Sequence, residues 1–373
     1  MSNSKELTIT CFCGAATHTF SVPFSSLPLS THLCNCNISR RISGSLLTSY
    51  VNIPNYSPNP DLSALTPYKS SKTLTRHFCS TCGTHMYLEY SEDGHFEAAT
   101  GTLQMESTDG IVDFQSHMWI EDTRDGGASQ FITHINGRKL TRYLQAPEPS
   151  VDIPLEWKTA SATDTHITGA QTIHAHCHCN GVEFYITPPN SSSRNAESPW
   201  PDLLVPYHTS NSDNLHNHPW WLSRHDRFLA GTCACNSCRR ASGFDITFWA
   251  FIPTMHITQD VSGTLPFSRR PYWGTMKTYQ SSEDATRTFC GTCGANVFWD
   301  GRESLIDVAV GLLDAESGAR AEELLAWWPG RVSFEEFALN RGLVKGLEDG
   351  LKGWAERNEG REYIATSAFP VLE

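Results

Sequence analysis

The segments CNCNISRRISG at residues 34–44 and CACNSCRRASG at residues 233–243 are two copies of one motif. Both copies contain a Cys-x-Cys pair, two consecutive arginines and a Ser-Gly dipeptide. They differ in one chemically important residue, because Ser39 of the first copy stands where the second copy has Cys238. The interval between the copies is too long for a solenoid repeat, so the motif indicates two tandem domains, each with its own core.

The other cysteines repeat in the same order on both sides of this motif. A Cys-x-Cys pair precedes each copy and a Cys-x-x-Cys-Gly segment follows it, which together contribute Cys11, Cys13, Cys79, Cys82, Cys177, Cys179, Cys290 and Cys293. The chain has 13 cysteines, an odd number that cannot be fully paired in disulfides. Every cysteine falls in one of these motifs, which favours metal ligation.

The spacing explains how the outer motifs would bind a metal. Residues i and i+2 of a strand point to the same face, so each Cys-x-Cys pair presents two thiols together. The Cys-x-x-Cys-Gly turn presents two more, and its glycine permits a positive φ. Four thiolates form the closed tetrahedral set of a structural zinc, which contributes on the order of 10 kcal/mol to folding. Reduced core cysteines and redox-active pairs are the alternatives.

The middle motif of the second copy has a different number of ligands. Cys233, Cys235 and Cys238 supply three thiolates, and three protein ligands with an exchangeable fourth position are typical of a catalytic zinc. A substrate thiol that enters this position loses its proton. We therefore expect these three cysteines to be the catalytic metal ligands. The alternative is a closed site completed by a distant histidine or aspartate.

The middle motif of the first copy keeps Cys34 and Cys36 as metal ligands but lacks the third thiol. A neutral serine hydroxyl replaces a thiolate poorly, so the simplest expectation is that this copy has lost tight zinc binding and acts as a scaffold or lid. His32 offers an alternative, because an H-x-C-x-C strand would place its imidazole on the same face as both thiols. The two alternatives differ in whether the chain binds a fourth zinc.

The order of these motifs, with HFCSTCGTHMYLEY at 77–90 and TFCGTCGANVFW at 288–299, resembles the glutathione-dependent formaldehyde-activating enzyme family, which shares its domain with centromere protein V. The resemblance covers about residues 8–145 and 173–330. It implies a mainly β fold in which each copy is a tent of small antiparallel sheets with a structural zinc and a second zinc on the middle cysteines. It also implies an activity that joins formaldehyde to glutathione, formally a carbon-sulfur lyase reaction run in reverse.

The repeat also predicts the domain boundaries. We expect a first domain at 1–145, a linker rich in proline, serine and threonine at 146–172, a second domain at 173–330 and a helical tail at 331–373. The second domain contains an insertion at about 190–222, which either roofs the pocket with His208, His216 or His218 or is a mobile surface loop.

Residue patterns predict the secondary structure of several segments. Short aromatic and β-branched stretches at 84–90, 181–187, 244–252 and 295–300 are typical of strands. Apolar residues at three- and four-residue steps predict helices over 315–328 and 333–359, the second with Ser333 as N-cap and Glu336 as its capping-box partner. The tail is expected to pack against the second domain or to bind a partner.

The arginine pairs that follow the middle cysteines are candidates for substrate binding. Arg239 and Arg240 could bind the carboxylates of glutathione, as could Arg40 and Arg41 in the first copy. The alternative is that these side chains are solvated or paired with neighbouring acids.

Composition narrows the function further. The formal net charge of −12, without clustered basic residues, argues against a nucleic-acid partner. The N-terminus lacks the pattern of a signal peptide and no apolar run reaches the length of a membrane span, so we expect a soluble cytoplasmic protein. Motifs of serine hydrolases, P-loop nucleotide hydrolases and dinucleotide oxidoreductases are missing.

These observations lead to two alternative functions. The first is a zinc-dependent carbon-sulfur lyase or synthase that acts on a thiol adduct, most simply glutathione with an aldehyde such as formaldehyde, with two structural zinc ions and one catalytic zinc. The second is a non-catalytic, zinc-stabilised interaction module. An exchangeable ligand on the middle zinc separates them, because only the enzyme requires one. The sequence does not fix the oligomeric state.

Overall fold

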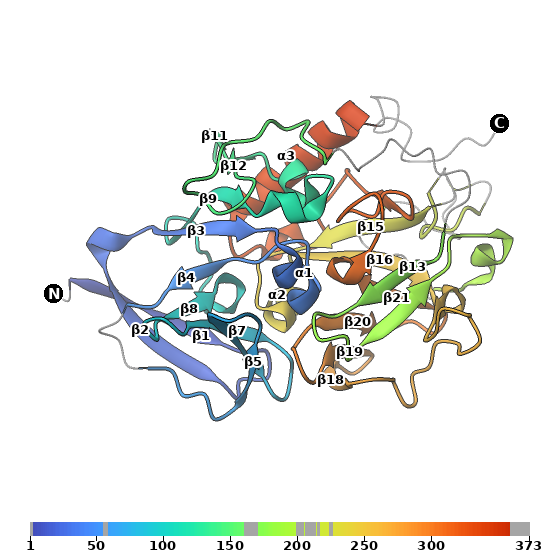
Figure 1. The fold of residues 1–373 in the computed structure, drawn as a ribbon, viewed down its shortest axis with the longest axis horizontal. Coiled ribbons are helices and arrows are strands. Elements are labelled where there is room, and N and C mark those ends of the chain that lie inside the picture. The colour runs from blue at the N-terminus through green and yellow to red at the C-terminus, as the bar shows by residue number, and fades with distance from the viewer. Residues whose placement is uncertain are drawn as a thin grey trace.

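A computed structural model describes residues 3–54, 59–159, 171–198, 205, 214, 217–223 and 227–358. The fold is mainly β, as expected, and the two copies lie side by side with the helices α1 and α2 between them (Figure 1). The strands predicted at 84–90, 181–187, 244–252 and 295–300 are all confirmed.

The first copy contains a five-stranded antiparallel sheet of order β4-β8-β7-β6-β5, a β1–β2 hairpin, a three-stranded parallel sheet of order β12-β9-β3 and a β10–β11 ribbon. Its strands are β1 (Ser4–Thr10), β2 (Thr17–Pro23), β3 (Leu29–Cys34), β4 (Tyr50–Asn52), β5 (Leu65–Lys69), β6 (Leu74–Cys79), β7 (His85–Tyr90), β8 (Phe96–Ala99), β9 (Val112–Met118), β10 (His134–Ile135), β11 (Arg138–Lys139) and β12 (Thr141–Arg142).

The second copy repeats this plan in a seven-stranded sheet of order β18-β19-β20-β21-β16-β15-β23 and a four-stranded sheet of order β17-β14-β13-β22. Its strands are β13 (Ile173–His176), β14 (Glu183–Ile186), β15 (Phe228–Cys233), β16 (Thr247–Pro253), β17 (Ile257–Thr258), β18 (Met276–Ser282), β19 (Ala285–Cys290), β20 (Asn296–Asp300), β21 (Leu305–Ala309), β22 (Leu313–Asp314) and β23 (Leu325–Trp327). The registers agree between copies, because Tyr50 pairs with Ala99 as Trp249 pairs with Ala309.

Two short helices follow the middle cysteines. They are α1 (Asn37–Ser43) and α2 (Asn236–Ser242), and each ends at a glycine with left-handed backbone, Gly44 or Gly243. The remaining short helices are 3-10 turns: η1 (Phe24–Ser26), η2 (Thr100–Thr102), η3 (Ile120–Thr123), η4 (Gly127–Gln130), η5 (Ser191–Asn195), η6 (Thr254–His256), η7 (Val310–Leu312) and η8 (Glu335–Phe337).

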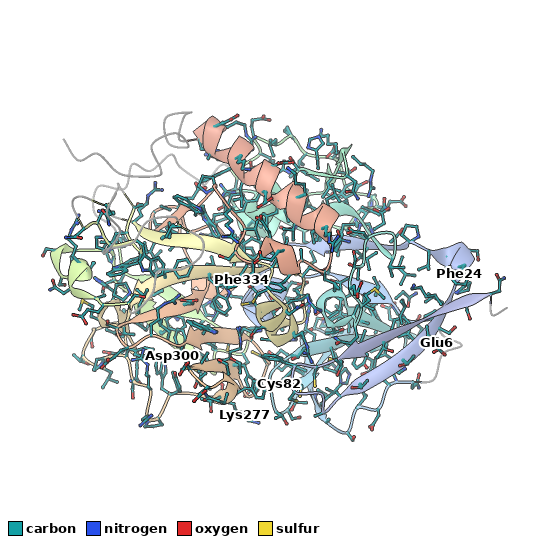
Figure 2. The ribbon with its side chains drawn as sticks, turned by 180° about the vertical axis from the view of Figure 1, so that it is seen from behind. Glu6, Phe24, Cys82, Lys277, Asp300 and Phe334 are labelled. Carbon is teal, nitrogen blue, oxygen red and sulfur yellow. The ribbon has the colours of Figure 1, made fainter. Side chains whose placement is uncertain are left out.

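The C-terminal helix differs from its prediction in start and packing. Helix α3 (Arg341–Asn358) begins after Asn340, whose side chain accepts from the amide of Leu343 at 2.8 Å. It packs on β10 and η4 of the first copy rather than on the second copy (Figure 2). The ring of Trp354 meets that of Phe131 in the first copy, with centroids 5.3 Å apart. The expected N-cap was wrong because Ser333 bridges to Cys233 instead. Among the described helices, none is long and apolar enough to cross a membrane.

The helix predicted over 315–328 is also wrong. This segment forms turns and the strand β23, which pairs in parallel with β15. Gly318 and Ala321 have positive φ angles of 123° and 49°, which an α-helix does not allow. The indole of Trp327 is buried between Phe131 and Phe248, with centroids 5.1 and 6.1 Å away. Burial against both copies therefore overrides the helical spacing of the apolar residues.

Each copy makes an equivalent contact with the other across their interface. The Gly101 amide donates to Gly243 at 2.9 Å, and the Gly311 amide donates to Gly44 at the same distance. Arg41 forms an ion pair with Asp314 at 3.0 Å. One cluster of contacting buried side chains runs through both copies, so they do not keep the separate cores that the repeat suggested.

The glycines of the Cys-x-x-Cys-Gly turns lie at this interface. Gly83 and Gly294 have φ angles of 79° and 81°, as the motif predicts. A Cβ on Gly83 would lie 2.5 Å from the ring of Phe289, and one on Gly294 would lie 2.6 Å from the ring of Phe78. Each turn therefore packs its bare backbone against an aromatic ring of the other copy.

A buried histidine at this interface predicts sensitivity to acid. The Nε2 atom of His85 lies 3.0 Å from the carbonyl oxygens of Ile42 and Gly294, and its Nδ1 has no hydrogen-bond partner. Burial and, secondarily, the charge of Arg76 lower the pKa of His85 from 6.5 to about 4. Because only the unfolded chain binds the proton between these values, stability is full above pH 6.5 and falls toward pH 4.

We expect His85→Asn to remove this part of the pH dependence, because Asn296 occupies the equivalent position in the second copy. Between pH 7 and pH 4, the free energy of unfolding of the wild type should fall by about 3 kcal/mol more than that of the variant. Urea unfolding at several pH values measures this difference. Parallel pH profiles for both proteins would contradict it.

Candidate metal centres and cavities

Each copy brings its four outer cysteines together. The Sγ atoms of Cys11, Cys13, Cys79 and Cys82 lie within 4.8 Å of one another, as do those of Cys177, Cys179, Cys290 and Cys293. A tetrahedral zinc with Zn–S bonds of about 2.3 Å separates its sulfurs by about 3.8 Å. The Cys11–Cys13 and Cys13–Cys79 sulfurs are 3.5 and 3.6 Å apart, and the equivalent pairs in the second copy are both 3.5 Å apart. The two sets therefore fit zinc.

Backbone amides support the sulfurs in these clusters. The amides of Val182 and Gly181 donate to the sulfurs of Cys177 and Cys179 at 3.3 and 3.4 Å. The amide of Cys293 donates to the sulfur of Cys290 at 3.4 Å. Such bonds favour thiolates over thiols, because a hydrogen bond to the charged form stabilises it. In each cluster the Cys-x-Cys pair and the Cys-x-x-Cys pair lie far apart along the chain, so a bound metal would connect the beginning of each copy to its later part.

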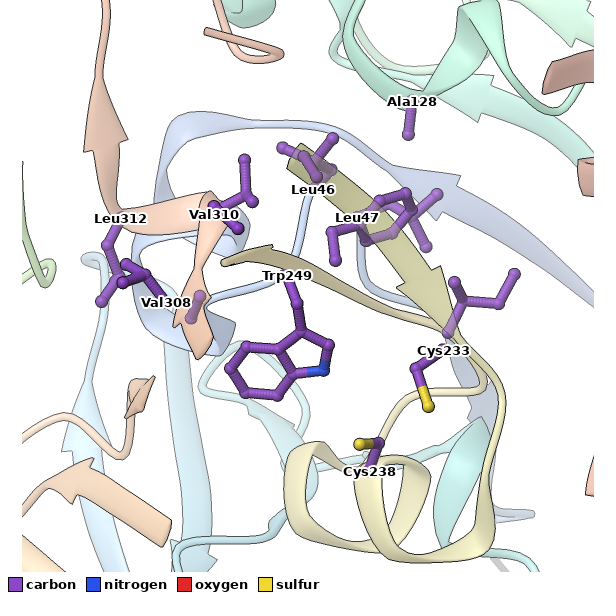
Figure 3. Close-up of a cluster of buried hydrophobic side chains, with 14 of the residues drawn as sticks. Leu46, Leu47, Ala128, Cys233, Cys238, Trp249, Val308, Val310 and Leu312 are labelled. Carbon is purple, nitrogen blue, oxygen red and sulfur yellow. The ribbon is translucent and has the colours of Figure 1, made fainter. Parts of the chain in front are cut away.

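The middle cysteines of the second copy form a three-sulfur group. Cys233 ends β15, Cys235 caps the N-terminus of α2, and Cys238 lies in its first turn. Their Sγ atoms lie within 4.8 Å of one another, and Figure 3 shows Cys233 and Cys238 near the indole of Trp249. Three soft thiolates on one strand-to-helix turn fit a zinc that retains one further coordination position.

A cavity of about 280 Å³ opens beside these three sulfurs. Its walls combine the aromatic rings of Trp249, Phe251, Trp299 and Phe334 with a few polar groups. The remaining lining residues are Gly231, Thr232, Ser237, Arg287, Arg302, Asp307 and Ser333, together with the three cysteines. A mainly apolar pocket with a few converging polar groups is typical of a small-molecule site.

Arg287 binds the sulfur group from the side. Its guanidinium is buried and donates to the Cys238 sulfur at 3.4 Å and to the Ser237 hydroxyl at 2.9 Å. Hydrogen bonds from Cys233 and Cys235, and then the positive charge of Arg287, hold the pKa of the Cys238 thiol well below its ordinary value. Arg287 therefore offsets the negative charge that three thiolates would leave on a bound divalent zinc.

Phe334 lies in the cavity wall in a strained conformation. Its φ and ψ angles are 59° and 38°, in the left-handed region that a bulky side chain rarely adopts. Trp119 in the first copy has the same geometry, with angles of 58° and 41°, and lines the first-copy cavity. Such conformations cost about 1–3 kcal/mol each and persist where the surrounding structure enforces them.

The first copy has a larger cavity without a third metal ligand. Cys34, Cys36 and Ser39 line a cavity of about 530 Å³, and the two sulfurs are 3.5 Å apart. His32 lines it too, but across the described residues its imidazole does not join the two sulfurs in a group within 4.8 Å. Its Nδ1 lies 2.8 Å from the Ser116 hydroxyl instead. The geometry thus does not support a three-ligand site through His32.

The comparison with protein families agrees with these centres. A sequence model of the glutathione-dependent formaldehyde-activating enzyme matches residues 6–122 and 224–329. The chain belongs to this family. The second match begins after the insertion and therefore covers the middle and last cysteine motifs of that copy. A comparison with curated proteins found no match.

Arg239 and Arg240 lie at the interface between the copies rather than in the cavity walls, whereas Arg40 donates to Asn37 and Asp122 of its own copy. Arg239 donates to the carbonyl oxygens of Gly101 and Leu103, the second at 3.3 Å. Arg240 donates to the carbonyl oxygen of Phe12 at 3.1 Å. Their prediction as glutathione ligands stays untested, but the cavity beside Cys238 has other cations, Arg287 and Arg302, on its walls.

The insertion contributes to the back of the cavity wall. His218 is buried, and its Nε2 lies 3.0 Å from the carbonyl oxygen of Leu222, whereas His208 and His216 lie outside the described residues. Trp220 packs on Phe251 with centroids 5.1 Å apart, and the guanidinium of Arg302 lies 5.3 Å from its ring. Phe251 and Arg302 both line the cavity, so this part of the insertion supports the pocket from behind.

Sequence reasoning missed several residues that a closer comparison of the copies would have found. Arg76 and Arg287 occupy the same place in the segments TRHFCSTCG and TRTFCGTCG, so their repetition was visible. A surface group of His174, His176 and Asp314 has ligand atoms within 4.8 Å of one another, and the His-x-His spacing was equally visible. The strained aromatics Trp119 and Phe334 gave no signal, because nothing in local sequence specifies a left-handed backbone.

Proposed function

We propose that this chain is a zinc-dependent enzyme whose second copy joins a thiol to an aldehyde, with glutathione and formaldehyde as the simplest substrates and S-(hydroxymethyl)glutathione as the product. One observation supports this most: Cys233, Cys235 and Cys238 present three sulfurs to the wall of an aromatic cavity. Family membership supports the same chemistry. The reaction forms a carbon–sulfur bond at the carbonyl carbon, and the thiol proton ends on the carbonyl oxygen.

A zinc on the three cysteines would lower the pKa of a substrate thiol at its open position and supply the thiolate. The protein's own residues then have separable tasks. Arg287 holds Cys238 by a 3.4 Å hydrogen bond and keeps the ligand set in place. Trp249, Trp299 and Phe334 limit the water that can reach the reacting carbon.

Charged groups on the cavity wall favour a zwitterionic substrate. Arg302 forms a buried ion pair with Asp307 at 2.7 Å, and both side chains line the cavity. Glutathione carries two carboxylates and an ammonium group, so a wall with both signs of charge suits it. The proposal includes a cytoplasmic location, because zinc–thiolate sites require reduced cysteines.

Exchange spectroscopy by NMR tests the proposal. The full-length zinc protein should accelerate the interconversion of formaldehyde plus glutathione with S-(hydroxymethyl)glutathione beyond the spontaneous rate. Cys238→Ser should return the rate to that of a buffer control, because two thiolates and a serine hold zinc weakly.

Cys36→Ser, which changes the first-copy equivalent of Cys235, is the matched control and should leave the rate unchanged. If wild type and Cys238→Ser both match the buffer rate while each structural zinc is retained, the non-catalytic zinc-stabilised module becomes the better account. If Cys238→Ser is as fast as wild type, the middle cysteines are not the reaction centre.

A further inference from the structure

The first-copy cavity contains a buried cation without an acidic partner. Arg76 is only 3% exposed, and its guanidinium donates to the hydroxyls of Tyr50 at 2.9 Å and Ser39 at 3.2 Å. Both acceptors are neutral, and its Nε has no hydrogen-bond partner. Within the described parts of the chain, no aspartate or glutamate forms an ion pair with it. A buried charge of this kind is costly unless something neutralises it.

The second copy shows what normally neutralises this position. There the equivalent Arg287 donates through the same Nη2 atom to the Cys238 sulfur at 3.4 Å. In the first copy Nη2 of Arg76 meets the Ser39 hydroxyl, which accepts the hydrogen bond but supplies no charge. The replacement of a thiol by serine therefore removes a metal ligand and also removes the sulfur that Arg287 contacts directly in the second copy, so that Arg76 has no direct anionic hydrogen-bond partner at this position.

The space around Arg76 is large enough for a ligand. The cavity of about 530 Å³ is nearly twice the volume of its second-copy counterpart at about 280 Å³. Its walls include the apolar side chains of Leu74, Leu88, Tyr90 and Trp119. Trp119 keeps the strained geometry that Phe334 has in the catalytic copy, although no three-cysteine group remains beside it. A strained aromatic residue in the wall and a buried charge in the same cavity are features expected of a binding pocket.

The two acidic residues in the cavity wall, Glu97 and Asp122, form hydrogen bonds with groups other than Arg76. Burial raises the pKa of Glu97, which disfavours its charged form, and its carboxyl accepts from the Tyr90 hydroxyl at 3.3 Å. Asp122 accepts from the amide of Asn37 at 2.8 Å, at the start of α1. Neither carboxyl group is hydrogen-bonded to Arg76, and a carboxylate that enters from the cavity would add a direct partner to the interactions that the charge of Arg76 has with Cys36 and Cys34.

We propose that the first-copy cavity is a metal-free binding site for a small organic carboxylate. The guanidinium of Arg76 would pair with the carboxylate, and the Tyr50 hydroxyl, which already accepts from Arg76, could donate its own proton to the same group. The aromatic and aliphatic walls would enclose the apolar body of the ligand. This site does not depend on the reaction proposed for the second copy.

Calorimetry with benzoate tests the site in the full-length zinc protein. Wild type should bind benzoate saturably at one site per chain, and the neutral isostere benzamide at least tenfold more weakly. Arg76→Met should weaken benzoate binding at least tenfold, and Arg76→Lys should retain part of the affinity because it retains the charge. Circular dichroism and zinc content confirm that each variant is folded.

Two further variants locate the site. Cys238→Ser, which disables the second-copy centre, should leave benzoate binding unchanged, so failure of the proposed enzyme function would not affect this result. Ser39→Cys restores a third thiol and should add one zinc per chain while benzoate binding falls at least tenfold. The proposal is overturned if benzoate does not bind, if it binds folded Arg76→Met as tightly as wild type, or if Cys238→Ser abolishes binding.

Discussion

Cys293→Ser is expected to prevent the second copy from folding. Cys293 is fully buried and belongs to the four-sulfur cluster that connects β13 to the turn after β19. A structural zinc contributes on the order of 10 kcal/mol, which matches the total stability of a typical domain at about 5–15 kcal/mol. Without it, the chain should accumulate as insoluble protein or unfold well below the wild-type temperature. Metal analysis and thermal unfolding measure both effects.

Cys34→Ser is the control for this prediction. It also removes a thiol, but Cys34 is only partly buried and lies outside both four-sulfur clusters. This variant should keep the wild-type zinc content and lose at most about 1–2 kcal/mol of stability. Should Cys293→Ser instead stay soluble with unchanged zinc and an unchanged unfolding temperature, the four cysteines would be ordinary core residues.

Asp125→Ala is expected to destabilise the whole chain by about 2–5 kcal/mol, because two buried amides lose their acceptor, while Arg320 keeps its ion pair with Glu322 at 2.7 Å. Asp125 lies in the first copy and accepts from the backbone amides of Gly127 and Arg320, both at 2.8 Å. The side chain of Arg320, from the second copy, lies 3.7 Å away, and both residues are at most 4% exposed on their side chains. Urea unfolding measures the loss, and a single transition should persist because the copies share one core.

Asp113→Ala provides the comparison, since Asp113 pairs with Arg138 at the surface of the first copy. Both of these side chains are about one-third exposed or more, so the loss should stay below about 1 kcal/mol. Equal losses in the two variants, or separate unfolding transitions for the two copies in Asp125→Ala, would show that the buried pair does not couple them.

The sequence predicted the grouping of the cysteines well because its determinants are local. Cys-x-Cys and Cys-x-x-Cys-Gly fix which sulfurs face the same way, and the order of the motifs fixes which pairs meet. The strands around Trp249 and Phe298 were predictable for a similar reason, since alternating aromatic and β-branched residues suit a pleated surface. These features need no knowledge of the rest of the chain.

The failures arose where distant contacts decide. Trp327 lies in a strand because it fills a space between Phe131 and Phe248, which no local spacing reveals. Ser333 has the chemistry of an N-cap, but its amide donates to Thr232 and continues the sheet beside Cys233. In each case the prediction followed a local preference, and a tertiary contact decided the structure instead.

The reciprocal packing of Gly83 on Phe289 and of Gly294 on Phe78 constrains how the duplicated halves can diverge. A duplicate that loses a metal ligand is usually free to accumulate changes. Here the first half still shapes the second, because a side chain at Gly83 would displace the ring of Phe289, the residue next to Cys290 of the second four-sulfur cluster. Selection can therefore relax the chemistry of the first half while it still preserves its shape.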